Sequence, residues 1–426
     1  MNRFHGYVAG VFGLSSLFVA SQALASAFAV REDSSEGLGT MFSGSASQAD
    51  SASTVFDNPA GMTELHGNQV EGGAVLVFPT INFHGSATGP GGTPTSGNNG
   101  ANAGRPAGAP NFYGVLDLSD QLKLGIAITS PFGLVVKQDA GWYGRYLAID
   151  SAVLSTNVDP SIAYKINDKI SVGAGLDAQW FQATLSQAFN QSAVGAGDAL
   201  ARYKGDDWGF GFNVGTLVKP WDSTKIGITY RSKVEHKLQG DLDFNNVAAP
   251  LSGALRSGPA TVDVSLPAST TVDVTQQITP ALSLSLGVQW TQWSTFKAVN
   301  FQGMTPVAPI NESFSDSWFT SIGATYQWSD AWTLRGGVGW DQSPVDDHYR
   351  TVSLPDQDRY MVGLGFGYKF SEALSVDGAY AHYFASPASM NGSINNTDNN
   401  PFGATVLHGT YQLSLDYISA SVRYKY

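Results

Sequence analysis

The sequence contains no cysteine. This excludes a disulfide framework, a cysteine nucleophile and any metal site built from thiolates. Charged residues make up only 14% of the chain, against roughly 25% in an average soluble protein. Basic residues are fewer than acidic ones, with 23 Lys and Arg against 35 Asp and Glu, so the net charge is -12. Binding to nucleic acid requires a basic stripe, and we therefore expect no nucleic-acid partner.

Long apolar runs are missing after the N-terminus. Residues 1–25 combine Arg3, an apolar run and the small-residue pattern Ala23-Leu24-Ala25, which predicts a secretory signal cleaved before Ser26. Beyond it, no segment approaches the ~18 to 20 apolar residues of a membrane-spanning helix. An exported chain without such helices can still enter a membrane as a closed β-barrel, because a barrel satisfies every backbone group between its strands.

Motifs for catalysis and metal binding are also missing. The histidines show no HExxH spacing, and no serine lies in a GxSxG elbow. Gly363, Gly365 and Gly367 repeat every second residue, which is typical of the lumen face of a strand rather than of a phosphate-binding loop. We therefore expect no enzyme, no cofactor and no metal. The enzymatic alternative, an outer-membrane hydrolase, would need a nucleophile with a placed histidine.

Alternation of apolar and polar residues dominates the rest of the chain. In Leu282–Trp290, leucine, valine and tryptophan occupy one face, while serine, glycine and glutamine occupy the other. A period of two over this length predicts a strand with one face in lipid and one in a polar lumen. Such segments recur from residue 69 to 426 with short and long connections in turn, and aromatic residues stand at their ends. The fold class is therefore all-β, a transmembrane antiparallel barrel of about 14 strands.

The last strand changes phase along its length. Ile418, Val422 and the terminal Tyr426 share one face, a pattern that resembles the sorting signal read by the machinery that assembles outer-membrane barrels. Leu413 and Tyr417 have the opposite phase. We expect either a bulge near Tyr417 or a change there from membrane to extracellular surroundings.

Residues 26–65 differ from everything that follows. They are rich in Ser, Gly and Ala, and they have no apolar face of either period wide enough to form a core of their own. Something else must enclose them. The sequence therefore predicts an N-terminal hatch at 26–65 that plugs a barrel formed by 66–426.

Several motifs in this order resemble the FadL-type outer-membrane transporters of long-chain fatty acids and other hydrophobic compounds. The resemblance runs from the hatch to the final strand and implies a 14-stranded plugged barrel that moves apolar molecules without ATP. Its motifs are Ser34-Ser35-Glu36-Gly37-Leu38-Gly39, Phe42-Ser43-Gly44, Asn58-Pro59-Ala60-Gly61-Met62, Trp208-Gly209-Phe210-Gly211-Phe212-Asn213, Tyr230-Arg231-Ser232, Asp341-Gln342-Ser343-Pro344-Val345 and Leu354-Pro355-Asp356-Gln357-Asp358-Arg359.

The resemblance also implies where a ligand binds. An apolar groove between the external segments Phe189–Gly205 and Gln239–Ala260 would capture the solute, and a deeper site would include Phe28. Lys297 matches one of the basic positions that meet the carboxylate of a fatty acid. The other basic position falls within residues 180–187, which contain no Arg or Lys. This departure leaves room for uncharged solutes such as aromatic hydrocarbons.

A break is expected in the third strand, at Ser130-Pro131-Phe132-Gly133. Proline removes a backbone donor from the ladder and glycine permits a bend, so the strand should kink or bulge there. By resemblance, this kink opens a lateral window in the wall that faces Asn58-Pro59-Ala60. We expect the side-chain amide of Asn58 to satisfy the backbone groups that the kink leaves unpaired.

Two other transport functions remain open from the sequence. One is a channel for uncharged aromatic hydrocarbons or other apolar solutes. The other is a general porin for polar solutes, which would have a charged constriction and no plug, and would form large steady pores in a planar bilayer. In each case we expect a monomer in the outer membrane of a Gram-negative bacterium, in contact with its lipid and lipopolysaccharide.

Overall fold

The computed structural model describes residues 27–89, 92–307, 309–393 and 405–426, so the predicted signal at 1–25 lies outside the described residues. None of the helices in these ranges is long and apolar enough to cross a membrane. The helical elements are α1 (Ser35–Thr40), α2 (Thr54–Asp57), η1 (Pro59–Glu64), η3 (Ser192–Val194), η4 (Ala249–Leu251) and η5 (Trp293–Thr295). The strands are β1 (Gln69–Thr88), β2 (Ala107–Asp117), β3 (Leu122–Thr129), β4 (Gly133–Lys137), β5 (Asp150–Asn167), β6 (Ile170–Phe189), β7 (Ala199–Trp221), β8 (Thr224–Arg231), β9 (Val234–Asn245), β10 (Gly258–Leu266), β11 (Ser269–Thr279), β12 (Leu282–Thr291), β13 (Ala298–Val299), β14 (Phe301–Gly303), β15 (Ile310–Asn311), β16 (Ser317–Gln327), β17 (Trp332–Asp341), β18 (Arg359–Lys369), β19 (Leu374–Ala385), β20 (Ala388–Ser389) and β21 (Val406–Lys425).

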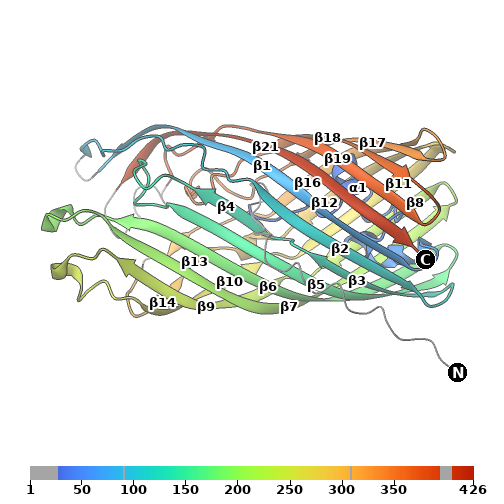
Figure 1. The fold of residues 1–426 in the computed structure, drawn as a ribbon, viewed down its shortest axis with the longest axis horizontal. Helices are drawn as coiled ribbons and strands as arrows, with labels where there is room; N and C mark the ends of the chain where they lie inside the picture. The colour runs from blue at the N-terminus through green and yellow to red at the C-terminus, as the bar shows by residue number, and fades with distance from the viewer. Residues whose placement is uncertain (1–26, 90–91, 308, 394–404) are drawn as a thin grey trace, which may run out of the picture.

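These strands form one closed antiparallel barrel, as predicted, with 14 strands in its wall. Sequential neighbours pair around the wall, and β3 with β4, β8 with β9 and β10 with β11 each make one interrupted wall strand. The first and last strands close it, from Gln69 opposite Lys425 to Thr88 opposite Val406. Figure 1 shows β1 and β21 side by side, with the short turns at the end that carries the C-terminus.

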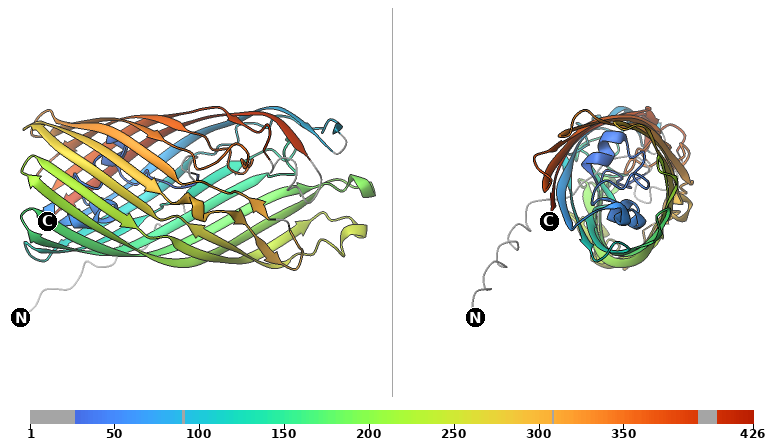
Figure 2. Two further views of the ribbon diagram at one scale, coloured as in Figure 1. Left: turned by 180° about the vertical axis from the view of Figure 1, so that it is seen from behind. Right: turned by 90° about the vertical axis from the view of Figure 1, so that its right-hand side faces the viewer.

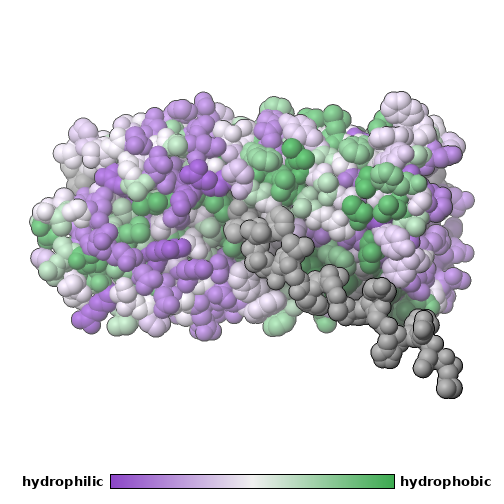
Figure 3. All heavy atoms as spheres, viewed as in Figure 1, coloured by the Kyte–Doolittle hydropathy of each residue, from purple (hydrophilic) through white to green (hydrophobic). Residues whose placement is uncertain are grey.

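The outer face of the wall is apolar where the alternation predicts it. On β12, Leu284 and Leu286 point outward and are exposed, while Ser283 and Ser285 point inward and are buried. In Figure 3, hydrophobic side chains gather over the half of the barrel nearer the C-terminus, and hydrophilic side chains are more frequent over the other half. An apolar outer band of this kind suits contact with lipid.

The last strand has no bulge near Tyr417. Its register against β1 and β19 is continuous, so one of the two expected explanations is wrong. Leu415 and Tyr417 point inward and are buried, whereas Ile418 and Val422 point outward and are exposed. The apolar residues change face because the interior becomes apolar away from the C-terminal end, while the exterior is apolar near that end.

Two segments predicted as long external loops are partly strand. β7 begins at Ala199, within the expected loop Phe189–Gly205. β9 continues to Asn245 and β10 begins at Gly258, both within the expected loop Gln239–Ala260. The strands extend beyond the apolar band, where their outer faces carry polar residues and their inner faces still bury apolar ones. The apolar outer band seen in the sequence is therefore shorter than the strands, and it does not show where they end.

The hatch lies inside the barrel. The right-hand view of Figure 2 looks along the barrel and shows this segment, with α1, enclosed by the wall. Wall glycines make room for its backbone: a Cβ at Gly227 of β8 would overlap the carbonyl oxygen of Ala46, and one at Gly337 of β17 would overlap that of Thr40. Gly363, predicted to face the lumen, lies against Leu38 and Met41 of the hatch.

Candidate functional site

An apolar groove lies at the end of the barrel away from the C-terminus. It is formed where the two segments expected to capture the solute face each other, with Tyr203 on β7 and Leu242 and Phe244 on β9. Leu147 and Phe301 add to its lining. The groove is thus formed largely by strands that extend past the apolar band, with connecting residues such as Leu147 at its side.

Behind the groove, the interior is filled by one continuous cluster of buried apolar side chains. It joins the groove residues Leu242 and Phe244 to Phe28, near the start of the described chain. The Phe28 side chain is 5% exposed, and its ring lies 5.0 Å from that of Trp293 and 5.5 Å from that of Phe296, centroid to centroid. Phe28 is therefore a core member of an aromatic cluster at the depth where the ligand was expected.

Lys297 follows this aromatic cluster directly in the chain. Its Nζ donates a hydrogen bond of 3.3 Å to the carbonyl oxygen of Phe314, whose ring contacts those of Trp293 and Phe296. The Lys297 residue is exposed, so its charge stands beside the cluster and not inside it. It lines neither the apolar groove nor the cavity described below.

The expected break in the third strand is present. Thr129 pairs with Asn157 of β5, but Gly133 pairs with Leu154, so the three residues Ser130–Phe132 face only two on β5. Because of the extra residue, odd-numbered residues point inward in β3, whereas the even-numbered Leu134 and Val136 point inward in β4. On its other side, β2 pairs with β3 from Asp117 to Phe112, and within the described residues it forms no ladder with β4. The wall is therefore interrupted beside Pro131.

Residues Ala27–Val30, which we call the N-terminal segment, bridge this break. The amide of Val30 donates to the carbonyl oxygen of Pro131 at 2.8 Å, and the amide of Gly133 donates to that of Phe28 at 2.8 Å. Ala29 and Phe132 form an antiparallel bridge. The backbone groups of Pro131 and Gly133 thus find partners in this segment, and those of Phe132 bond to the Ser155 hydroxyl of β5. These bonds avoid a cost of ~1 to 3 kcal/mol for each buried unpaired group.

The other end of the N-terminal segment is held by Asp356. The amide of Ala27 donates to this carboxylate at 3.2 Å, and the hydroxyl of Ser343 donates to the same oxygen at 2.8 Å. Burial raises the pKa of Asp356 to about 6, although Arg359 and these hydrogen bonds oppose the shift. The two loop motifs that contain Ser343 and Asp356 therefore position the start of the segment.

Asn58 does not lie at the break, so the expectation that its amide satisfies the kinked backbone is wrong. Its Nδ2 donates to the carbonyl oxygens of Ala46 at 2.7 Å and Thr216 of β7 at 3.1 Å, and its Oδ1 accepts from the amide of Ala60. A Cβ at Gly173 of β6 would overlap Pro59 and Ala60. Asn58-Pro59-Ala60 therefore fastens the hatch to β6 and β7.

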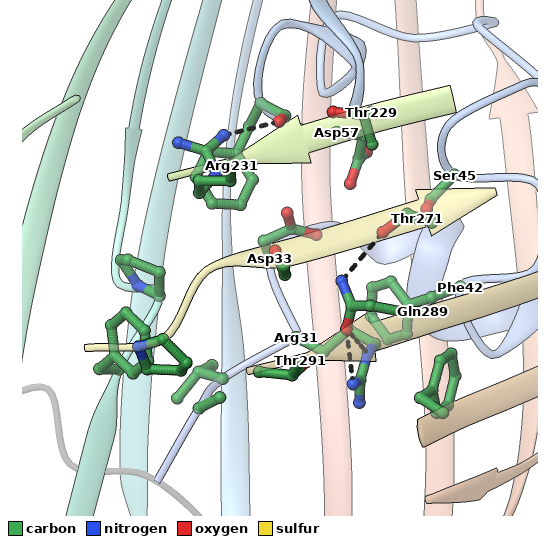
Figure 4. A pocket seen from close by; sticks show the side chains of 18 of the residues that line it. Arg31, Asp33, Phe42, Ser45, Asp57, Thr229, Arg231, Thr271, Gln289 and Thr291 are labelled. Atoms are coloured by element: carbon green, nitrogen blue, oxygen red, sulfur yellow. Dashed lines mark hydrogen bonds between the residues drawn. The ribbon is translucent and has the colours of Figure 1, made fainter. Parts of the chain in front are cut away.

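A second cavity lies on the hatch side of the N-terminal segment. It contains about 1120 Å³ of empty volume, part of it open to solvent. Pro131 and Phe132 of the break line it, together with Val30 and Leu266. Figure 4 shows polar and charged side chains in the rest of its lining, with Arg31, Asp33 and Arg231 among them, beside apolar ones such as Phe42.

The comparisons with known proteins agree with this geometry. The family described as "Outer membrane protein transport protein (OMPP1/FadL/TodX)" matches residues 16–426. The chain belongs to this family. As a FadL-family member, it is an outer-membrane β-barrel that transports hydrophobic compounds.

Individual relatives share most of the chain. The long-chain fatty acid transport protein of Escherichia coli K12 is 30% identical over 399 residues, covering 84% of this chain and 88% of that protein. The crystal structure of a Pseudomonas aeruginosa FadL homologue superposes with a TM-score of 0.87 at 26% identity, covering 94% and 99% of the two chains. The toluene transporter TbuX of Ralstonia pickettii, with a TM-score of 0.65 at 20% identity over 92% and 99%, shares the fold.

The sequence did not indicate the charged side chains that face the interior of this FadL-family barrel. Arg231 ends β8, binds Asp159 and Asp177, and stacks on the Phe56 ring at 4.0 Å from its centroid. Arg31 donates to Gln289 Oε1 at 2.8 Å. Arg231 could have been found in the sequence as a charged residue at an inward-facing strand position. Its partners could not, because they are distant in the chain.

Proposed function

We propose that this transporter takes up long-chain fatty acids from outside the cell. The acid binds the apolar groove, enters the buried cluster, and reaches the break in the wall when the N-terminal segment moves aside. The observation that carries this proposal is the continuous apolar cluster between the groove and Phe28, because Phe28 belongs to the segment that bridges the break. The similarity to the long-chain fatty acid transport protein of Escherichia coli supports the solute class.

The apolar interior gives a hydrophobic chain a favourable path. Each methylene group that leaves water for apolar surroundings gains ~0.8 kcal/mol. Phe28 occupies the place that such a chain would fill, so ligand and Phe28 compete for contact with Trp293 and Phe296. Displacing Phe28 pulls on Ala29 and Val30, which weakens their hydrogen bonds to the break. Ligand arrival and opening of the wall are coupled in this way.

Lys297 should distinguish acidic from uncharged ligands. Its ammonium group stands beside the aromatic cluster and has only a carbonyl oxygen as its hydrogen-bond partner in the described structure. We expect Lys297→Ala to weaken oleate binding about 5-fold to 20-fold, the range of a partly exposed charge-assisted hydrogen bond. Binding of oleyl alcohol should change less than twofold. Equilibrium binding to the purified protein measures both ligands.

Lys237→Ala is the matched control, because Lys237 is also exposed but lies on the outer face of β9, opposite to the face that contributes to the cluster. It should leave both ligands unaffected. If Lys297→Ala weakens the binding of oleate and of oleyl alcohol equally, Lys297 does not bind the carboxylate.

Uncharged aromatic hydrocarbons are the second candidate solute. The rings around Phe28 supply an aromatic surface, and residues 180–187 offer no basic group for a carboxylate. If cells with the wild-type protein accumulate labelled toluene but the purified protein binds no oleate, aromatic hydrocarbons replace fatty acids as the proposed solute.

We also propose that a signal peptide is cleaved before Ser26 and that the barrel is a monomer in contact with lipid and lipopolysaccharide. The assembly machinery then recognises the final strand. The exposed residues Ile418, Val422 and Tyr424 of that strand, followed by the terminal Tyr426, support recognition. Membrane fractionation with N-terminal sequencing tests the cleavage site.

A further inference from the structure

The cavity on the hatch side of the N-terminal segment has an excess of negative charge. The charged side chains in its lining are Arg31, Asp33, Asp57, Asp177, Arg231 and Asp273. Both cations already have partners on the wall. Arg231 pairs with Asp159 and Asp177, and Arg31 pairs with Asp341 at 3.6 Å while donating to Gln289.

Three carboxyl groups in the lining have no cationic partner. Within the ranges that the structure describes, Asp33, Asp57 and Asp273 take part in no ion pair of 4.0 Å or less. Asp33 is 8% exposed and Asp273 is 0% exposed, and each has one carboxylate oxygen without a hydrogen-bond partner. In Figure 4, Asp33 and Asp57 project toward the same space. Buried carboxylates without partners are costly, so this space favours a proton or a cation.

The surroundings of these carboxyl groups suit an organic cation better than a metal ion. No group of three or more acidic or histidine side chains in the described part of the chain is placed to hold a metal. Thr229 and Thr271 add hydroxyl oxygens beside the carboxyl groups. Val30, Phe132 and Leu266 add an apolar side toward the break.

We infer that this cavity binds the ammonium group of an amphiphilic amine. The ammonium group donates hydrogen bonds to Asp33 and Asp57, Asp273 adds negative charge to the same lining, and the apolar tail lies toward Phe132 at the break. This adds a second ligand class, of opposite charge to a fatty acid, at a place separate from Lys297. It stands or falls independently of the proposed uptake of fatty acids.

Protons compete with the amine for this site. Burial raises the pKa of Asp33 to about 7, and burial together with neighbouring carboxylates raises that of Asp57. An alkylammonium group stays charged up to about pH 10, so the carboxyl groups alone decide the pH dependence between about pH 5.5 and 8. They must lose their protons to pair with it, and amine binding therefore strengthens as the pH rises.

The test compares three ligands that share a twelve-carbon tail: dodecylammonium, dodecanoate and dodecanol. Their equilibrium binding is measured on the full barrel reconstituted in phosphatidylcholine vesicles, for wild type, Asp33→Asn and Asp57→Asn. Asp243→Asn is the control, because Asp243 is exposed on β9 outside the cavity. Resistance to heat in gel electrophoresis checks that every variant is folded.

We expect each cavity variant to lower the ratio of dodecylammonium to dodecanoate binding at least tenfold, and the control to leave it unchanged. Dodecylammonium binding to wild type should rise between pH 5.5 and 8 by about tenfold. An unchanged ratio in both folded cavity variants would overturn the inference, as would equal weakening of all three ligands. If wild type binds dodecylammonium in this Asp-dependent way but not dodecanoate, the fatty-acid proposal fails and the amine site stands.

Discussion

Deleting Pro131 should reduce uptake of labelled oleate at least tenfold while leaving a folded barrel in the outer membrane. The deletion removes the one extra residue by which Ser130–Phe132 exceed their partners on β5, so β3 and β4 can pair with β5 in a single register. A continuous strand can then extend its ladder toward β2. The N-terminal segment loses the backbone groups that it now bridges, and the wall stays closed when ligand arrives.

Pro131→Ala is the matched control for this deletion. It removes the ring but keeps the residue count, so the register shift between Thr129 and Gly133 remains. We expect it to keep more than half of wild-type uptake at equal surface levels of the protein. If the folded deletion variant transports oleate normally, the solute does not leave through this part of the wall.

Arg423→Ala should release the hatch from the last strand. Arg423 is 9% exposed and binds three carboxylates: Glu36 of the hatch, Glu71 of β1 at 3.0 Å and Asp377 of β19 at 3.5 Å. Removing the shared cation takes from Glu36 and Glu71 their ion pair in the described structure, while Asp377 keeps its pair with Arg335 at 2.7 Å. We expect the free energy of unfolding to fall by ~3 to 5 kcal/mol, because removing one partner of a buried ion pair leaves the other charge buried and uncompensated.

Planar-bilayer conductance reports the state of the hatch directly. The Arg423→Ala barrel should show frequent openings, because Glu36 of α1 no longer has its partner on the wall, while wild type stays closed. Lys425→Ala is the control, because Lys425 lies two residues along the same strand but is exposed at the barrel end. A closed channel with wild-type unfolding in Arg423→Ala would show that the hatch is held by other contacts.

The wall could be predicted from the sequence because its signal is local. Alternation over Leu282–Trp290 reports which face meets lipid, and Pro131 within an apolar strand reports the break. The small, polar composition of residues 26–65 predicted a segment that another part of the chain must enclose, and the wall glycines that accommodate it face inward. Each of these features depends on neighbours within a few residues.

The partners of the site residues could not be predicted, because they depend on contacts distant in the chain. Asn58 was expected at the break, but it binds the backbone of β7, since the hatch turns toward β6 and β7. The groups that meet the break belong to Phe28 and Val30, which no motif had assigned to it. The three carboxylates around Arg423 come from three segments of the chain, and no sequence spacing connects them.

On the proposed path, the N-terminal segment must leave the break before solute can pass. The chain has no cysteine, so one disulfide can lock the segment without competing thiols. Ala29 and Phe132 form an antiparallel bridge, whose Cα separation of about 4.5 to 5.5 Å suits a disulfide. The double variant Ala29→Cys, Phe132→Cys is compared with itself before and after reduction, which cancels the loss of the Phe132 ring.

Uptake of labelled oleate by cells carrying this double variant is the deciding measurement, with mass spectrometry confirming the cross-link. Ser86→Cys, His408→Cys, which joins β1 to β21 outside the path, controls for oxidation itself. We predict that the oxidised lock lowers uptake at least tenfold, that reduction restores it, and that the control pair transports equally in both states. Equal uptake by the fully cross-linked and the reduced double variant would contradict the account, because solute would then pass with the N-terminal segment fixed across the break.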